Sequence, residues 1–411
     1  MNLRIRKKYL FYVLLIVSSI LGAISASLDG VISYLYIENS WVFGMAVMVA
    51  GIPVTLGLAG VLSLPWGTRS LGARIDPSFR RFRLLRRHEL GYHLLAGVGN
   101  TVVTLSHFYL VSVFVDPSTV LPFFQVVILY LLVAESLSEK DAPTLAEIES
   151  SVIVTFGAIM AAMSLTGSLN VDALLVIFLV MNPAWVVLAV YQRKLKHLVI
   201  DDRPNDAINI RTWNVLFTAG MISAAVYLYR PGYFDRALAT VGDVDMFGWL
   251  ALTMTIIFFS YILYIRALGI GKASITQAVK ASTIIFSIPL SLVLSGVLDY
   301  SFSASPTLLA FKLMGIVLVV LGVSSFALTE VKAYVFINAK TGYRMAELLR
   351  EVWRIRGVAS VSVLAGKYDL MAKIRIRTLG KGYERIIRRL EEIPAVKEFN
   401  WQSILKEWEE I

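Results

Sequence analysis

The stretch Ala278–Val297, AVKASTIIFSIPLSLVLSGV, holds one Lys, Lys280, inside an otherwise apolar run. A run of this length and composition predicts a helix that crosses a membrane. A cation near the centre of such a helix costs about 3 kcal/mol or more unless it faces protein or water. Lys280 is therefore predicted to face the interior of a helical bundle and to serve a function there. Two alternatives remain: the side chain extends to the cytoplasmic interface, or it forms a structural ion pair with an acid such as Glu135.

Similar apolar runs recur along the 411-residue chain, of which 57% is hydrophobic. Soluble domains contain about 45–50% apolar residues, so the composition indicates a membrane protein. The runs predict about ten membrane spans. They lie near residues 9–27, 41–64, 91–114, 118–137, 150–167, 172–192, 212–229, 246–267, 273–297 and 307–328. The predicted fold is an all-α polytopic membrane bundle, followed by a tail of different character.

The basic residues of the chain, whose net charge is +10, are concentrated in alternate loops. The loop after the second span is rich in Arg between Arg69 and Arg87, whereas Leu28–Ser40 and Leu298–Pro306 contain no Lys or Arg. This asymmetry is the positive-inside pattern. It predicts a multi-pass protein of the cell membrane with both termini in the cytoplasm. The charge is therefore attributed to a lipid bilayer as partner, and no nucleic acid is expected.

The residue types that several kinds of chemistry need are missing or scattered. The chain has no Cys, which excludes thiolate metal sites and Cys nucleophiles, and its four His include no pair with metal-ligand spacing. It also lacks the Gly-rich loop ending in Gly-Lys-Ser/Thr that cradles phosphates. We therefore expect neither an enzyme nor a bound metal or cofactor, and no residue is predicted to be catalytic.

Two parts of the chain share an order of features, which predicts an internal repeat. In the first part, a tight turn at Asp116–Thr119 precedes a span that carries Gln125. In the second, a tight turn at Gly271–Ser274 precedes the span that carries Gln277 and Lys280. Weak similarity between hydrophobic segments is common, but paired turns with paired polar residues favour a true repeat.

The repeat predicts two membrane domains, residues 1–165 and 166–330, with five spans each. An odd number of spans per half inverts the second copy in the membrane. Inverted repeats are typical of secondary transporters, whose substrate site lies near the midplane where the halves meet.

Two short motifs carry a resemblance to a known family. A Glu near the end of the fourth span, in Val133–Ser136, and the glycines Gly315 and Gly322 of the last span match its pattern, while Ala161–Ala162 stand where a second Gly is expected. Through these motifs the membrane part, residues 1–330, resembles the EamA-like members of the drug/metabolite transporter superfamily. The resemblance implies ten spans in two inverted five-span repeats and transport of a small metabolite.

Five polar residues inside the predicted spans are candidates for the substrate pathway: Lys280, Gln277, Gln125, Asn182 and His107. Gln277 precedes Lys280 by one helical turn, so both lie on one helix face. Gln125 takes a similar place in the first repeat. Lys280 would be the counter-charge for a carboxylate or phosphate group. The alternative for Asn182 and His107 is a hydrogen bond between helices.

The tail, residues 331–411, alternates short strands and amphipathic helices instead of long apolar runs. Period-2 and helical spacings of apolar residues predict six elements in the order βαββαβ, which is ferredoxin-like. The predicted elements are Ala333–Ile337, Tyr343–Ile355, Val358–Leu364, Leu370–Ile376, Gly380–Ile393 and Val396–Ile404.

Three motifs of the tail match one family: Arg356–Val358, Gly366–Leu370 and Ile393–Val396. With them, the tail closely resembles the ligand-binding domain of Lrp/AsnC transcription regulators, without that family's helix-turn-helix module. The resemblance implies a homodimer or higher oligomer that binds an amino-acid-like effector near Gly366, Tyr368 and Asp369. The alternative for Asp369 is a structural role in its hairpin.

The two resemblances together predict a secondary transporter of a small polar metabolite, regulated by a cytoplasmic domain that binds a small molecule. An amino-acid-like substrate and export are favoured, because the domain resembles an amino-acid sensor. The alternative is a non-transporting membrane sensor whose tail oligomerises and recruits partners. Lys280 favours transport, since a sensor has little need of a cation inside a span.

Overall fold

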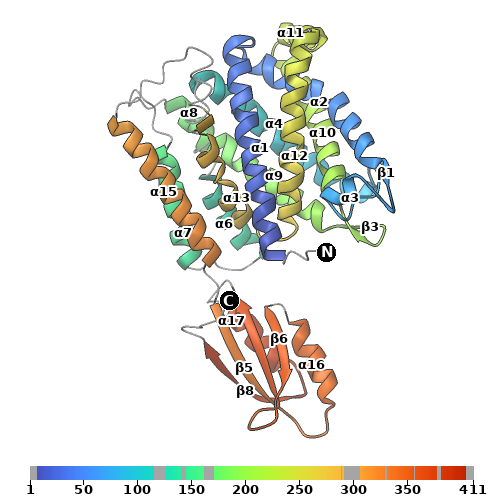
Figure 1. Cartoon of the computed structure of the whole chain (residues 1–411), viewed down its shortest axis with the longest axis vertical. Coiled ribbons are helices and arrows are strands. Elements are labelled where there is room, and N and C mark those ends of the chain that lie inside the picture. The colour runs from blue at the N-terminus through green and yellow to red at the C-terminus, as the bar shows by residue number, and fades with distance from the viewer. Residues whose placement is uncertain are drawn as a thin grey trace. The chain divides into compact units, whose positions relative to one another are not determined.

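The computed structural model describes residues 7–114, 126–139, 145–161, 171–287, 289–290, 306–328, 331–355, 357–376 and 381–403 (Figure 1). The chain divides into two compact units. The first comprises Met1–Leu132 with Ser151–Val323, and the second comprises Val133–Ser150 with Ser324–Ile411.

The first unit is built from helices, with two short hairpins at helix ends. Its helices are α1 (Lys7–Leu35), α2 (Ser40–Ser63), α3 (Gly72–Ile75), α4 (Arg87–Phe114), α8 (Val171–Leu175), the π-helix η2 (Val176–Met181), α9 (Asn182–His197), α10 (Ala207–Tyr229), α11 (Pro231–Gly242), α12 (Val244–Leu268) and α13 (Ala273–Lys280). The hairpins are β1–β2 (Pro65–Trp66, Arg69–Ser70) and β3–β4 (Val199–Ile200, Arg203–Pro204). Three more helices have residues in both units: α6 (Val127–Glu139), α7 (Leu145–Ala161) and α15 (Pro306–Leu328).

Five helices of the described part are long and apolar enough to cross a membrane. They are Leu10–Leu35, Ser40–Ser63, Arg87–Val113, Val176–His197 and Val244–Leu268. The prediction of a helical region with several membrane-type spans is thereby confirmed. The larger number of spans stays a prediction, in part because residues 115–125, 162–170 and 291–305 lie outside the described residues.

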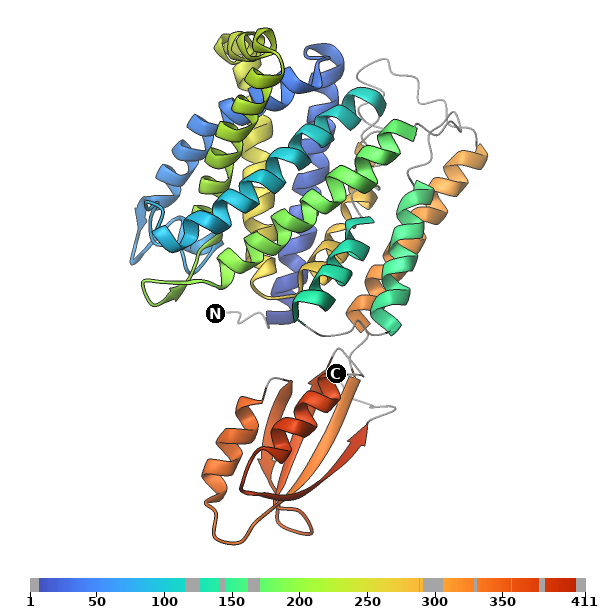
Figure 2. The same cartoon turned by 180° about the vertical axis from the view of Figure 1, so that it is seen from behind.

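Small residues bring the long helices together in pairs, with α1 along α12 and α4 along α9 (Figures 1 and 2). Where α1 meets α12, the hydroxyls of Ser18 and Ser260 each donate to the other residue's carbonyl at 2.8 Å. Where α4 meets α9, Gly99 leaves no room for a side chain, because a Cβ there would lie 2.7 Å from the Ala184 carbonyl oxygen. These close crossings fix the helices that line the candidate site.

Two helix ends differ from the predicted spans, and both differences matter for the site. The first span was predicted to end at residue 27, but α1 continues to Leu35 and so includes Asp29. The span predicted at 273–297 is interrupted, because α13 ends at Lys280 and a turn follows. At this end the Lys280 carbonyl accepts hydrogen bonds from the hydroxyls of Ser19 (3.2 Å) and Thr283 (2.6 Å).

The tail has the predicted order of elements. These are β5 (Val331–Ala339), α16 (Met345–Arg354), β6 (Val358–Val363), β7 (Leu370–Ile376), α17 (Lys381–Glu391) and β8 (Val396–Ser403). The strands form one sheet in the order β6-β7-β5-β8, with antiparallel pairing throughout. The predicted βαββαβ order is thus confirmed.

The sheet of the tail has one buried face and one partly buried face. Alternate residues of β5, among them Val335 and Ile337, are buried in a core shared with Leu348 of α16 and Leu390 of α17. The other face carries Tyr334 and Phe336, which are only partly buried. Alternation along a strand explains both faces.

Candidate functional site

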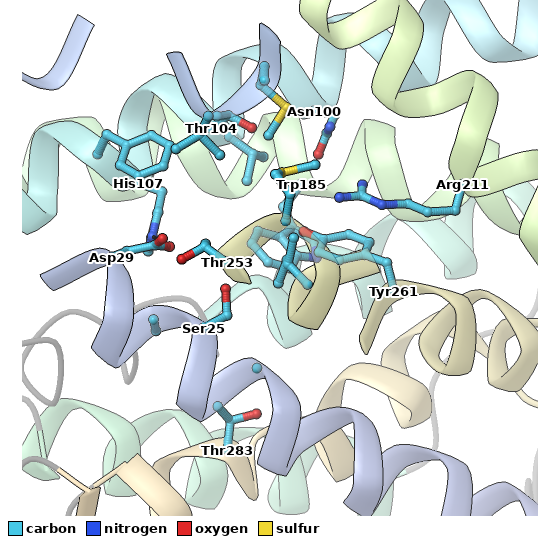
Figure 3. Close-up of a pocket in the computed structure, with 18 of the residues that line it drawn as sticks. Ser25, Asp29, Asn100, Thr104, His107, Trp185, Arg211, Thr253, Tyr261 and Thr283 are labelled. Carbon is cyan, nitrogen blue, oxygen red and sulfur yellow. Dashed lines mark hydrogen bonds and ion pairs between the residues drawn. The ribbon is translucent and has the colours of Figure 1, made fainter. Parts of the chain in front are cut away.

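A cavity of about 120 Å³ lies within the first unit, between residues of α1, α2, α4, α9, α10, α12 and α13 (Figure 3). Much of its wall is apolar, including Met48, Met254 and Ile257. Ionisable side chains enter it from several helices. A largely apolar pocket with a few convergent polar groups is the usual form of a small-molecule site.

Two cations occupy one part of the cavity and share an aromatic ring. The guanidinium carbon of Arg211 lies 4.2 Å from the centre of the Tyr261 ring, and the ammonium nitrogen of Lys280 lies 4.9 Å from it. The ring of Tyr264 lies 4.6 Å from the same ammonium. Arg211 is 1% exposed and Lys280 is 7% exposed. Among the described residues, no carboxylate forms an ion pair with either cation.

The local sequence explains how each cation reaches the cavity. Asp206 caps the first turn of α10 by accepting from the Asn209 amide at 2.7 Å, which places Arg211 in the second turn. There the guanidinium also donates to the Asn214 side chain at 3.2 Å. Lys280 is the last residue of α13, and the partial negative charge at a helix carboxyl end favours a cation.

An acid and a histidine occupy another part of the cavity. Asp29 of α1 and His107 of α4 lie with Oδ2 and Nε2 3.2 Å apart. Figure 3 shows this pair on one side of the cavity and Arg211 with Tyr261 on the other. The second carboxylate oxygen of Asp29, Oδ1, is buried and has no hydrogen-bond partner among the described residues.

Further polar atoms in the cavity wall lack partners within the described part of the chain. They are the hydroxyls of Ser25 and Thr253 and the Nε of Arg211. Buried polar groups are normally hydrogen-bonded, so these atoms are open to hydrogen bonds with water or with a solute in the cavity. The wall offers donors at the cationic end and an acceptor at Asp29.

Three of the predicted pathway residues, Lys280, Gln277 and His107, line this cavity. Lys280 is buried in protein and does not extend to the surface. Asn182 is fully buried where η2 meets α9 but is not part of the cavity wall, and Gln125 lies outside the described residues.

Sequence reasoning missed Arg211, Asp29 and Tyr261. Arg211 directly precedes the predicted seventh span and looked like a flanking basic residue, while Asp29 was placed in a loop. The available signal was the length of the flanking apolar sequence: Val31–Leu35 continues the apolar pattern beyond Asp29. Tyr261 had no signal of its own, because aromatic residues are common in membrane helices.

A second polar cluster joins the residue after α3 to the last turn of α9 and to the loop between α9 and α10. The ammonium of Lys196 lies 2.6 Å from the Asp76 carboxylate, and both side chains are buried. Burial raises the pKa of Asp76, but Lys196 and the amides of Ala207 and Ser78 outweigh this effect, so its pKa is lowered. The cluster therefore holds Asp76 ionised and ties these segments together.

In the loop before α4, Arg83 donates to both oxygens of Glu89, which lies in the first turn of α4, at 2.7 Å. Glu89 also accepts from the side-chain amide of Asn205 at 2.7 Å. A bidentate pair with a further hydrogen bond is a strong, geometrically fixed contact. This part of the Arg-rich loop is therefore structural.

The predicted effector residues of the tail lie at the turn between β6 and β7. The Asp369 carboxylate accepts from the backbone amide of Ala339 at 2.8 Å, which links the turn to the end of β5. The Tyr368 hydroxyl accepts from the Asn400 side chain at 3.3 Å, and its ring lies 5.2 Å from that of Phe336. The contact of Asp369 favours its structural alternative. Effector binding by Gly366, Tyr368 and Asp369 stays a prediction.

Comparison with known families identifies the tail. Residues 332–410 match the Lrp/AsnC ligand binding domain. The chain thus carries an Lrp/AsnC ligand-binding domain at its carboxyl end. No curated protein matches the chain. A solved structure described only as "Crystal structure of protein" is 13% identical, aligned over 75% of this chain and 97% of its own, with a TM-score of 0.45.

Proposed function

We propose that the chain is a secondary transporter of a small, amino-acid-like metabolite, regulated through its Lrp/AsnC ligand-binding domain. The observation that carries this proposal is the pair of buried cations, Arg211 and Lys280, which contact one ring in the cavity. Neither cation forms an ion pair with a carboxylate of the described residues. Buried charges are costly unless they are paired. A substrate carboxylate between the two cations would supply that pairing.

The proposed substrate site lies where the two predicted repeats would meet. Its cations come from α10 and α13 of the second half, whereas Asp29 and His107 come from α1 and α4 of the first. Transporters built from repeats place their substrates at such interfaces.

The helix pairs support a two-fold repeat. Suppose that α1, α2 and α4 of the first half correspond to α9, α10 and α12 of the second. Replacing each helix by its counterpart then turns the contact of α1 with α12 into the contact of α9 with α4. It likewise converts the contact of α2 with α12 into that of α10 with α4. All four contacts are extensive in the structure. A packing scheme that is unchanged when the halves are exchanged is what a pseudo-two-fold repeat produces.

Regulation is proposed from the identity of the tail. A small molecule that binds the domain can change transport only if it favours one of the transporter's conformations over another. We propose an amino-acid-like effector, self-association of the tail, and export as the direction, so that cytoplasmic accumulation of the effector activates removal of a related compound.

Counterflow in proteoliposomes tests the proposal directly. Vesicles with the purified full chain are loaded with an unlabelled solute, and uptake of the same labelled solute is followed at equal pH and zero potential. Amino acids are expected to exchange, whereas the corresponding amines, which lack the carboxylate, are expected not to. If none of a broad panel of amino acids and other carboxylates exchanges, the transporter proposal is wrong and the sensor alternative takes its place.

A further inference from the structure

We propose that the Asp29–His107 pair is a shared site for a proton and for the substrate's ammonium group, so that the transporter exchanges substrate for protons. This inference rests on the proposed function, because it needs an amino-acid-like substrate in the cavity. It adds the coupling ion, which the proposed function leaves open.

The geometry of the pair carries the inference. One carboxylate oxygen of Asp29 faces the His107 Nε2 at 3.2 Å, and the other is buried without a hydrogen-bond partner among the described residues. Asp29 is 6% exposed and lines the cavity. An ionised carboxylate only accepts hydrogen bonds, so the free oxygen can accept from an ammonium group or bind a proton. Acid–histidine pairs within membrane helices commonly form proton relays.

The other titratable groups of the cavity lie on the remaining helices. Tyr261 comes from α12, Lys280 from α13 and Arg211 from α10, whereas α2 and α9 contribute Val47, Met48 and Trp185 to the wall. Within the described part of this wall, Asp29 is thus the single carboxylate. A substrate ammonium that enters the cavity has this one anionic partner.

Proton and ammonium therefore exclude each other. A zwitterion whose carboxylate lies between Arg211 and Lys280 would direct its ammonium to the ionised Asp29. Protonation removes the negative charge and places a hydrogen where the ammonium would donate. The proton also adds one positive charge to a cavity that already holds two cations. The zwitterion adds no net charge, because its carboxylate enters together with its ammonium.

The exchange balances as follows. One zwitterion leaves the cell with its own three ammonium protons, and one proton from outside binds the vacated Asp29–His107 pair. After reorientation that proton is released inside when the next substrate binds. No bond of the substrate changes and no redox partner is needed. Because the zwitterion carries no net charge, each cycle moves one positive charge inward.

The test measures substrate affinity and driven transport as functions of pH with the full chain. At pH values where the pair holds its proton, the substrate affinity of the wild type should fall about tenfold for each unit by which the pH is lowered. Displacement of one proton by the substrate requires this slope. Asp29→Asn cannot exchange this proton and should show a weak affinity that is independent of pH. Asp245→Asn, which alters an exposed acid outside the cavity, is the matched control and should behave as the wild type.

Driven transport gives a second readout, which uses the wild type alone and so does not depend on the folding of the Asp29→Asn variant. In wild-type vesicles, an inward proton gradient should drive efflux of loaded substrate, and a potential negative inside should accelerate it. The contrary result is normal counterflow in which the proton gradient does not change efflux and pH does not change substrate affinity. That result would overturn the inference and leave the transporter proposal intact. Absence of counterflow for every amino acid would remove both.

Discussion

The ammonium of Lys280 is held over the ring of Tyr261, 4.9 Å from its centre. The guanidinium of Arg211 lies over the same ring at 4.2 Å. One aromatic side chain thus contacts two cations, and its electron-rich ring partly offsets their mutual repulsion in a buried site. Because the cations are already in place, an incoming carboxylate needs little rearrangement to bind, which is the structural basis of the transport proposal.

Tyr261 itself provides the first prediction. A cation–π contact of a desolvated cation contributes about 2 kcal/mol. Loss of the ring should displace Arg211 above all, because Lys280 keeps its contact with Tyr264, and should weaken substrate binding by at least about tenfold. Tyr261→Leu is expected to raise the KM of counterflow by that factor. Tyr261→Phe keeps the ring and serves as the control with a small change. Equal KM values for both variants would show that the ring does not position the cations.

The buried pair of Asp76 and Lys196 provides a stability prediction. Lys196→Met leaves the Asp76 carboxylate buried without its cation, which costs about 3–5 kcal/mol. We expect a clearly lower Tm in detergent, together with faster proteolysis of the segments that the pair joins. Lys194→Met changes an exposed Lys of the same helix and should leave the Tm nearly unchanged. A Lys196→Met protein as stable as that control would contradict the structural role.

The lowered pKa of Asp76 sets the sign of a pH effect. A carboxyl group whose folded-state pKa lies below its unfolded value near 3.8 stabilises the fold above that value, and this stabilisation is lost as the pH falls through the folded pKa. Asp76→Asn should therefore be less stable at neutral pH but lose less stability on acidification than the wild type. Thermal unfolding from about pH 7 down to about pH 3 checks this, and parallel curves for the two proteins would contradict it.

The contact of α7 with α15 permits a matched glycine comparison. A Cβ at Gly157 would lie 2.6 Å from the Gly315 carbonyl oxygen, whereas a Cβ at Gly220 of α10 meets nothing within 4 Å. Gly157→Ala should therefore destabilise the protein through a clash with backbone. Gly220→Ala should stabilise it by up to about 1 kcal/mol through helix propensity. Opposite shifts in Tm are expected, and shifts of the same sign would show that the helices do not meet closely at Gly157.

Asp369 separates the structural from the sensory role of its hairpin. Its carboxylate accepts from the Ala339 amide, so Asp369→Ala leaves that donor unsatisfied and should cost about 1–3 kcal/mol. Hydrogen exchange at the ends of β5 and β7 should accelerate. Calorimetry with amino acids then tests the sensor, at temperatures where the domain of both proteins is folded. If the wild-type chain and the Asp369→Ala variant both bind an amino acid, Asp369 has a structural role alone.

The tail could be predicted in detail because its signals are local. Alternation in Leu370–Ile376 and helical spacing in Tyr343–Ile355 depend on neighbouring residues only. The observed strand has the predicted bounds, and the observed helix, Met345–Arg354, is shorter than predicted by three end residues. Even so, sequence left the partner of Asp369 open, since Ala339 reaches it only through the pairing of the sheet.

The cavity could be predicted only in part, because it is assembled from distant helices. Lys280 was found since a cation inside an apolar run is conspicuous. Arg211 and Asp29 lie near predicted span ends, where charged residues are common, and only the packing of α10 and the full length of α1 bring them inside. The ring that joins the two cations, Tyr261, depends on the crossing of α12 with its neighbours and left no trace in the sequence.

The central claim is that Lys280 binds the substrate's carboxylate, and counterflow with a Lys280→Leu variant tests it most directly. Leu removes the ammonium and adds no polar group, and Lys194→Leu at an exposed position of α9 is the control. We expect Lys280→Leu to fold, reconstitute and lose amino-acid counterflow, and Lys194→Leu to retain it. Counterflow by Lys280→Leu at the wild-type rate and KM would contradict the assignment of this cavity as the substrate site.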